Sequence, residues 1–237
     1  AYSKNIAEII DKHCDIVLVG DSLGSVLYNY NTTRKVTLSN MIEHSMSVKK
    51  AIKKSLMVVD MPYKTYRNKS EALKNAKKII RLTKCDAVKL EGGLHVAKII
   101  KHLIKNKIQV MGHLGILPQS VRGSFKFKGR NEKEKKKLLK EAKVLEKIGV
   151  FSIVLECIKP ITASLITKSV KIPTIGIGSS SICDGQVLVT DDLLGLNQTK
   201  IKFVKKFINL KKIINDVIKN FKKEVKLKKY PSKKYSY

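Results

Sequence analysis

Short apolar runs recur along the chain, separated by longer stretches in which apolar and charged residues mix. Seven such runs occupy residues 15–21, 56–62, 86–93, 109–115, 151–157, 173–179 and 185–191. Within them the apolar residues follow one another without regular alternation with polar ones, as in DIVLVGD and FSIVLEC. Continuous runs of this length predict strands that are covered on both faces, which is typical of a parallel sheet.

Most of the intervening stretches have the apolar spacing of amphipathic helices. The predicted helices cover residues 39–55, 70–82, 94–106, 132–149, 161–170 and 201–225. We expect Ser39 and Ser70 to cap two of these helices at the amino end, and Gly149 to end a third.

The order of the predicted elements indicates the fold class. A helical stretch from Asn5 to Lys12 precedes the first predicted strand, which implies one more strand, truncated at or before Ala1. Eight strand–helix units in 237 residues predict a TIM (β/α)8 barrel with a truncated first strand. We expect one barrel domain over residues 1–225 and a basic tail over 226–237. A doubly wound sheet is the alternative, because strand order cannot be read from one sequence.

Composition excludes several other classes of protein. A hydrophobic content of 43% is enough for a sizeable core, and no apolar run reaches the length of a membrane span. The four cysteines form no CxxC pair and the five histidines no HExxH motif, so a zinc site is not expected. Unpaired thiols in a reducing cytoplasm are the expected state of the cysteines, and we predict a cytoplasmic protein without a membrane partner.

The charge balance raises the question of a nucleic-acid partner. The formal net charge is +30, from 49 basic and 19 acidic residues. Specific nucleic-acid contacts rely mainly on arginine and aromatic stacking, but the chain has five arginines, and its lysines are spread over every predicted helix. We therefore expect salt-sensitive, non-specific attraction and no specific nucleic-acid partner, and we retain a basic nucleic-acid-binding protein as an alternative of a different class.

Four acidic side chains stand at the carboxyl ends of predicted strands, where the active site of a barrel lies. They are Asp21, Asp60, Glu91 and Glu156. Any one of them could be a helix cap or a hydrogen-bonded buried carboxylate. Four carboxylates gathered together repel each other and lose hydration, so they favour a hard divalent cation, and Mg²⁺ prefers such oxygen ligands.

Two further residues at strand ends could take part in the chemistry. Lys89 lies two residues before Glu91, so both side chains point into the predicted barrel mouth. Lys89 could stabilise an anionic substrate or oxyanion, form a Schiff base, or serve only as the counter-ion of Glu91. His113 could donate a hydrogen bond there, or it could be a core histidine whose hydrogen bonds are satisfied.

A series of phrases at these strand ends resembles a known family. VGDSLG, DMPY, VKLEGG, GHLGILPQS, KGR, VLEC, IPTIGIG and CDGQVLV occur in the order and spacing of the ketopantoate (3-methyl-2-oxobutanoate) hydroxymethyltransferase family. The resemblance runs from Ala1 to the C-terminal tail, and GHLGILPQS is its most specific phrase.

The resemblance implies an activity, a cofactor and residue roles. The activity is transfer of a hydroxymethyl group from 5,10-methylenetetrahydrofolate to 3-methyl-2-oxobutanoate, giving 2-dehydropantoate, in a Mg²⁺-dependent homo-oligomer that is typically a decamer. Matched to this sequence, the metal ligands would be Asp21, Asp60 and Glu91, and the proton acceptor Glu156. The keto acid would contact Asp21, Ser22, Asp60, Lys89 and His113, with Lys89 also stabilising negative charge.

Another enzyme class uses a similar barrel and similar intermediates. Mg²⁺-dependent carbon–carbon lyases of the phosphoenolpyruvate mutase and isocitrate lyase type usually carry a cysteine-bearing phrase such as KKCGH, which this sequence lacks. That class is therefore the alternative enzyme, and a requirement for tetrahydrofolate would separate the two.

Overall fold

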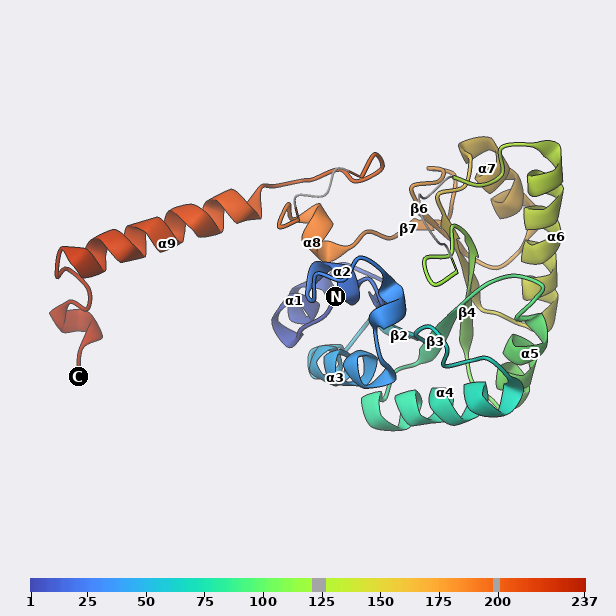
Figure 1. Cartoon of the computed structure of the whole chain (residues 1–237), viewed down its shortest axis with the longest axis horizontal. Helices are drawn as coiled ribbons and strands as arrows, with labels where there is room; N and C mark the ends of the chain where they lie inside the picture. Colours follow the sequence, from blue (N-terminus) through green and yellow to red (C-terminus); the bar gives the residue numbers. More distant parts are fainter. Residues whose placement is uncertain (121–126, 198–200) are drawn as a thin grey trace. The chain divides into compact units, whose positions relative to one another are not determined.

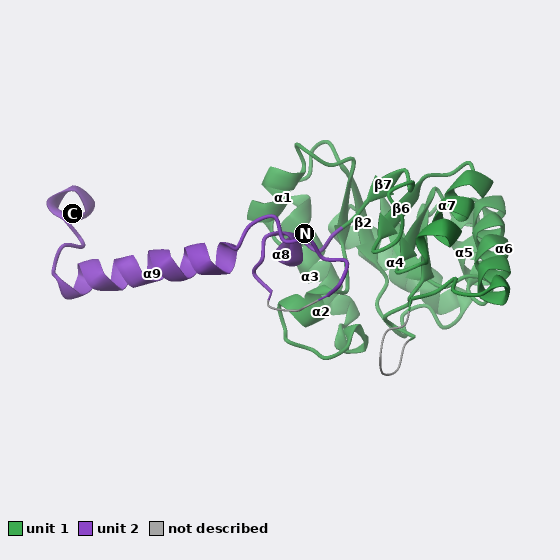
Figure 2. Cartoon of the chain, turned by 90° about the horizontal axis from the view of Figure 1, so that it is seen from above, with its two compact units in different colours: residues 1–187 green, residues 188–237 purple. Residues whose placement is uncertain are grey.

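The computed structural model describes residues 1–120, 127–197 and 201–237. They fall into two compact units, residues 1–187 and 188–237, coloured separately in Figure 2. Unit 1 contains the whole sheet. Its strands are β1 (Ile16–Val19), β2 (Leu56–Asp60), β3 (Ala87–Glu91), β4 (Val110–Gly115), β5 (Ser152–Glu156), β6 (Thr174–Ile177) and β7 (Gly185–Gln186).

All seven strands are parallel and lie side by side in sequence order, β1 to β7. A doubly wound sheet would reverse its strand order, so this order confirms the barrel-type fold and excludes the alternative. Among the described residues β1 and β7 do not pair with each other, and the eighth strand predicted ahead of Asn5 is not seen. The amino nitrogen of Ala1 donates to the Leu18 carbonyl at 3.0 Å, which sets the first residues beside β1.

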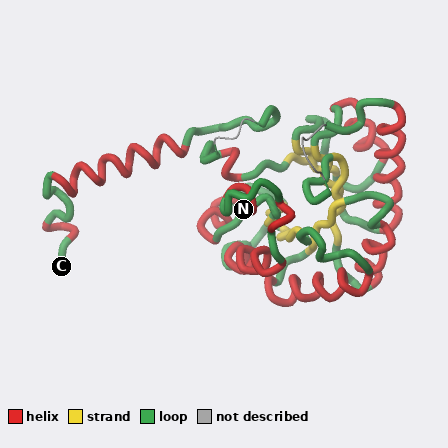
Figure 3. Tube along the Cα trace, in the orientation of Figure 1, coloured by secondary structure: helices red, strands yellow, loops and turns green. Residues whose placement is uncertain are grey.

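Helices of unit 1 surround the outer face of the curled sheet, as Figures 1 and 3 show. They are α1 (Lys4–Ile10), α3 (Leu38–Lys49), α4 (Lys69–Thr83), α5 (Ala97–Lys105), α6 (Glu132–Ile148) and α7 (Pro160–Ser169), while the short helices α2 (Leu23–Val26) and η1 (Thr33–Lys35) lie in the connection between β1 and α3. Outward strand residues such as Val88, Leu90 and Val110 are fully buried, because the helices cover that face. The unalternated apolar runs therefore predicted the strands correctly.

Helix ends follow capping chemistry, although two predicted caps were wrong. Thr37, not Ser39, caps α3, because Thr37 and Asn40 exchange side-chain and backbone hydrogen bonds in a capping box. Asn68, not Ser70, caps α4 by accepting from the backbone N–H of Glu71. Gly149 ends α6 with φ +97°, as predicted, because glycine adopts this conformation without strain.

The inner face of the sheet carries a small apolar cluster, which we call the inner layer. Val58, Ala87, Met111 and Val154 form its buried centre, and partly buried neighbours including Leu18 and Ile175 pack against it. One residue from each of four adjacent strands builds this floor, in the manner of the side-chain layers of a barrel.

Unit 2 consists of α8 (Thr190–Leu193), α9 (Leu210–Lys226) and η2 (Lys233–Tyr235). The helix predicted over 201–225 begins only at Leu210, because Asn209 caps it by accepting from the backbone N–H of Lys212. No described helix is both long and apolar enough to cross a membrane. The division into a barrel up to residue 225 and a tail beyond it stays a prediction.

Candidate active site

Strand register brings the predicted charged residues together at the carboxyl ends of β2 to β5. Asp60 pairs with Lys89, Glu91 with His113, and Gly115 with Glu156. Asp60, Lys89, His113 and Glu156 each come two positions after an inner-layer residue of the same strand, and Glu91 comes two positions after Lys89, so these side chains lie on the same face. The site therefore consists of polar side chains stacked above an apolar floor.

Lys89 and Asp60 form a buried ion pair. Lys89 Nζ lies 3.0 Å from Asp60 Oδ1, and both side chains are almost completely buried. Burial alone would lower the pKa of Lys89, but the carboxylates of Asp60, Glu91 and Asp21 outweigh it and raise that pKa above its ordinary value. Lys89 therefore stays protonated at neutral pH. A Schiff-base role needs a neutral amine, so the geometry favours a charge-stabilising role.

Asp21 and Glu91 carry unbalanced negative charge. Burial, together with the neighbouring Asp60, raises the pKa of Asp21 to about 7. Burial, with the charge of Asp21 next in importance, also raises the pKa of Glu91 well above its usual range. Asp21 lies close to Asp60, since its backbone N–H donates to Asp60 Oδ2 at 3.1 Å. The acidic cluster, which we define as Asp21, Asp60, Glu91 and Glu156, is thus short of positive charge.

His113 lies between the lysine and the proposed base. Its Nδ1 is 3.5 Å from Lys89 Nζ and 3.7 Å from Glu91 Oε1, and its Nε2 is 3.0 Å from Glu156 Oε2. Burial and the Lys89 ammonium lower the pKa of His113, so the ring is neutral at pH 7. An ammonium can only donate, so Nδ1 accepts and the ring proton faces Glu156. Glu156 keeps 20% of its side chain exposed, which leaves it open to a substrate.

Ser22 lies next to Asp21, at the amino end of α2. Its hydroxyl is 2.7 Å from the hydroxyl of Tyr2, which links it to the first residues of the chain. All seven predicted site residues are therefore on the loops or strand ends at one end of the sheet. Their individual roles stay predictions.

Gln119 is a site residue that the sequence analysis did not single out, although its phrase GHLGILPQS was quoted. Its backbone N–H donates to Glu91 Oε2 at 3.0 Å, and its side-chain Nε2 donates to Asp21 Oδ2 at 2.8 Å and to the Met61 carbonyl at 3.0 Å. Its Oε1 is 2.5 Å from the hydroxyl of Tyr66. An amide in a loop has no periodicity that would reveal such contacts.

The family of the chain follows from comparison with known sequences. The family model for ketopantoate hydroxymethyltransferase matches residues 1–233. The chain belongs to this family. A 3-methyl-2-oxobutanoate hydroxymethyltransferase of Pelagibacter ubique is 66% identical over all of this chain and 92% of its own length. The Anaplasma marginale (strain St. Maries) protein of the same name is 44% identical over all of this chain and 86% of its own length. The resemblance drawn from the strand-end phrases is confirmed.

Solved structures confirm the fold of this ketopantoate hydroxymethyltransferase family member. A phosphonopyruvate hydrolase structure, in complex with oxalate and Mg²⁺, matches with a TM-score of 0.61 at 11% identity, covering 99% of this chain and 86% of that chain. A 2,3-dimethylmalate lyase of the phosphoenolpyruvate mutase and isocitrate lyase superfamily matches with a TM-score of 0.59 at 10% identity, covering 100% and 82%. At such identities the likeness concerns the fold alone.

The donor chemistry of the acidic cluster suits a magnesium ion. Asp21 and Asp60 lie side by side and offer the hard oxygen donors that Mg²⁺ takes, usually one or two carboxylates with water and substrate in the other positions. Over residues 1–120, 127–197 and 201–237, no group of three or more His, Cys, Asp or Glu side chains could hold a metal ion. The proposed set of three ligands, Asp21, Asp60 and Glu91, is thus not assembled around one point in this structure and stays a prediction. Glu91 instead accepts a hydrogen bond from the backbone N–H of Gln119.

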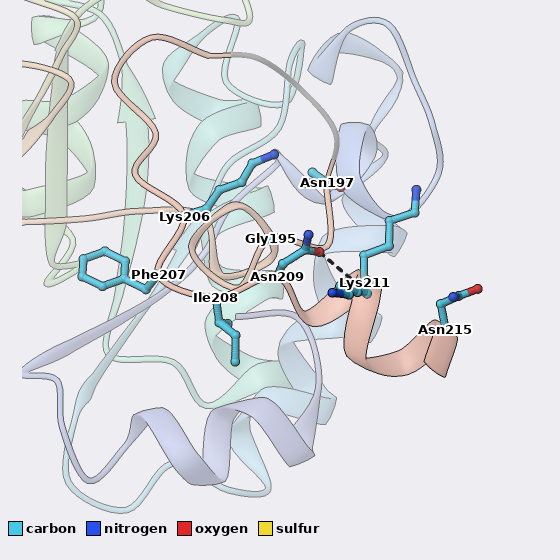
Figure 4. A pocket seen from close by; sticks show the side chains of 9 residues that line it. Gly195, Asn197, Lys206, Phe207, Ile208, Asn209, Lys211 and Asn215 are labelled. Carbon is cyan, nitrogen blue, oxygen red and sulfur yellow. Dashed lines mark hydrogen bonds between the residues drawn. The ribbon is translucent and has the colours of Figure 1, made fainter. Parts of the chain in front are cut away.

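A pocket of about 630 Å³ lies within unit 2 (Figure 4). Lysine and asparagine side chains, together with Gly195, Phe207 and Ile208, line it. None of the nine residues that line it is acidic or a histidine, so it lacks the carboxylate and imidazole groups that gather at the strand ends. The strand ends of unit 1 are therefore the candidate active site.

Proposed function

We propose that the chain transfers a hydroxymethyl group from 5,10-methylenetetrahydrofolate to 3-methyl-2-oxobutanoate and forms 2-dehydropantoate, a step of pantothenate biosynthesis. The observation that carries this proposal is the 66% identity, over the whole chain, with an enzyme named for this reaction. The clustering of Lys89, His113 and the acidic cluster at the strand ends supports it, because the reaction needs a base and a means of stabilising negative charge.

The keto acid binds against Lys89 and the residues beside it. The Lys89 ammonium is held at 3.0 Å from Asp60 and stays charged, so it pairs with the developing negative charge on the keto oxygen. Asp21, Ser22 and His113 complete the contacts to this substrate. Asp21, Asp60 and Glu91 would hold Mg²⁺, and the bound ion would supply Lewis-acid stabilisation of the same charge.

Glu156 is the proton acceptor. Its carboxylate is the most exposed of the charged groups at the strand ends, and His113 holds it in place through Nε2. The C3–H bond of the keto acid breaks, its proton moves to the Glu156 carboxylate, and its electron pair moves toward the keto oxygen, giving an enolate. No covalent adduct with Lys89 is needed.

The carbon–carbon bond then forms at C3. Water adds to the methylene carbon of the folate, which is activated as an iminium, and the carbon–nitrogen bond breaks to release formaldehyde and tetrahydrofolate. The enolate carbon attacks the formaldehyde carbon, and the formaldehyde oxygen takes up a proton to become the hydroxyl group. Water supplies the hydroxyl oxygen, so the balanced products are 2-dehydropantoate and tetrahydrofolate.

The test is an assay with 3-methyl-2-oxobutanoate, methylenetetrahydrofolate and Mg²⁺, with and without a chelator. We expect 2-dehydropantoate to form only when all three are present, and the chelator to stop the reaction. Cleavage of a carbon–carbon bond without folate would instead favour the lyase-type alternative. The homodecameric assembly, the cytoplasmic location and the absence of a specific nucleic-acid partner remain predictions. DNA binding that keeps a sequence preference at physiological salt would contradict the predicted absence of a specific nucleic-acid partner.

A further inference from the structure

Gln119 donates hydrogen bonds to two of the acids of the site, Asp21 and Glu91. It lies in the turn after β4, with only 2% of its surface exposed. Through its backbone and its side chain it reaches Glu91 and Asp21, which are 28 and 98 residues away in the sequence. Every polar group of its side chain has a partner in these contacts.

The partners determine how the Gln119 amide is oriented. The Met61 carbonyl can only accept a hydrogen bond, and so can Asp21 Oδ2 when Asp21 is ionised. The nitrogen of the Gln119 amide must therefore face both of them. Its oxygen then faces the Tyr66 hydroxyl, which must donate. Asp21 and Met61 thus determine which way the amide faces, and the Tyr66 hydroxyl holds the amide oxygen in that orientation by donating to it.

A neutral amide has a particular advantage at this position. Lysine or arginine here would neutralise Asp21 and Glu91 and remove the negative charge that attracts a cation. The side-chain amide of Gln119 donates to Asp21 and its backbone N–H donates to Glu91, so neither hydrogen bond adds a charge. Gln119→Met removes the first bond and keeps the second, so it tests the contact with Asp21. One oxygen of each carboxylate is thereby held by the protein, and the other is left for a ligand.

We infer that Gln119 is a positioning residue: it fixes the orientation of Asp21 and Glu91 toward the metal ion and the keto acid, and Tyr66 fixes Gln119. This inference rests on the proposed function for the identity of the ligands. It does not make Gln119 a catalytic residue, because its polar groups are all engaged with the protein.

The experiment compares Gln119→Met, Tyr66→Phe and the double variant with the wild-type chain. Gln186→Met is the matched control, because it removes a different amide, one whose Nε2 donates to the Ser180 carbonyl at 2.8 Å. Mg²⁺ binding and 3-methyl-2-oxobutanoate binding in Mg²⁺ are measured by titration calorimetry. The KM for the keto acid, kcat and urea-induced unfolding are measured in parallel.

We expect Gln119→Met to weaken Mg²⁺ binding by about 10- to 100-fold and to raise the KM for the keto acid more than it lowers kcat. Tyr66→Phe should have a smaller effect of the same kind, and the double variant should be no worse than Gln119→Met alone. Gln186→Met should bind both ligands as the wild type does. If Gln119→Met does not fold, Tyr66→Phe still tests the inference.

Two results would overturn the inference. One is that folded Gln119→Met binds Mg²⁺ and the keto acid with affinities within about twofold of wild type. Such a change is too small for the loss of a hydrogen bond to the Asp21 carboxylate. The other is additive effects of the two substitutions, because Tyr66 would then not act through Gln119. A wild-type chain that binds Mg²⁺ but does not turn over would count against the proposed function alone, since the calorimetric comparison still decides the role of Gln119.

Discussion

Asp21→Asn is expected to stabilise the metal-free protein while abolishing its function. The Asp21 carboxylate is buried beside Asp60 and near Glu156, which oppose its ionisation, while Lys89 and Gln119 favour it. Asparagine removes the charge but keeps an oxygen that can accept the hydrogen bond from Gln119 Nε2. The substitution therefore removes an electrostatic cost with little change of shape.

The size and the pH dependence of the effect follow from the pKa. Asp21 loses its proton near pH 3.8 when unfolded and near pH 7 when folded. Between these values the folded state binds the extra proton, so stability falls as pH rises, and the loss is complete above pH 7. At about 1.36 kcal/mol per pKa unit, ionised Asp21 lowers the free energy of unfolding by about 4 kcal/mol.

Urea-induced unfolding of wild type and Asp21→Asn, with a chelator present and at several pH values from 4 to 8, measures this difference in the free energy of unfolding. Asp21→Asn should be more stable than wild type at pH 8 by up to about 4 kcal/mol, and the difference should shrink toward pH 4. Asp11→Asn is the control of opposite sign: backbone N–H groups of Ser55, Lys53 and Lys54 hold the pKa of Asp11 at about 2, so its charge stabilises the fold above pH 4. An Asp21→Asn protein less stable than wild type at pH 8 would refute the reasoning.

Three further substitutions test the site. Glu156→Gln should slow C3 proton exchange of the keto acid, followed by NMR in D₂O, by about 10²- to 10⁴-fold while keto-acid binding persists; rapid exchange would remove its role as base. Lys89→Met should lower kcat by about 10²- to 10³-fold, and an unchanged kcat would contradict a charge-stabilising role. Gly115→Ala should cost about 1–3 kcal/mol in urea unfolding, because φ is +105° there and a Cβ would overlap the Glu156 carbonyl oxygen; wild-type stability would show that the turn relaxes freely.

Much of the fold was predictable because strands that are buried on both faces have continuous apolar runs in the sequence. Strands such as β5 lie within the predicted apolar runs, since their outward residues meet helices and their inward residues meet the inner layer. Helix ends were less predictable. Several residues near an end can cap, and the choice of Thr37 over Ser39 depends on the reciprocal bonds with Asn40.

The site was predictable where its chemistry coincides with the ends of strands. Asp60, Lys89, Glu91 and Glu156 each end or nearly end a strand, so parallel topology alone brings them together. Two features, one set by loop conformation and one by the register between strands, could not be predicted. One is the contact of Gln119 with two acids; the other is the pairing of Lys89 with Asp60 across the β2–β3 register instead of with Glu91 on its own strand.

The two-residue spacing between the inner layer and the charged side chains has a consequence for how this protein can change over time. Deleting or inserting a single residue in β3 would turn Lys89 and Glu91 toward the surrounding helices and bring Val88 and Leu90 inward. A single such change would therefore disrupt both the packing of the core and the active site. Variation in length is therefore expected to accumulate in the loops, while each strand keeps its residue count, even where the identities of its apolar residues drift.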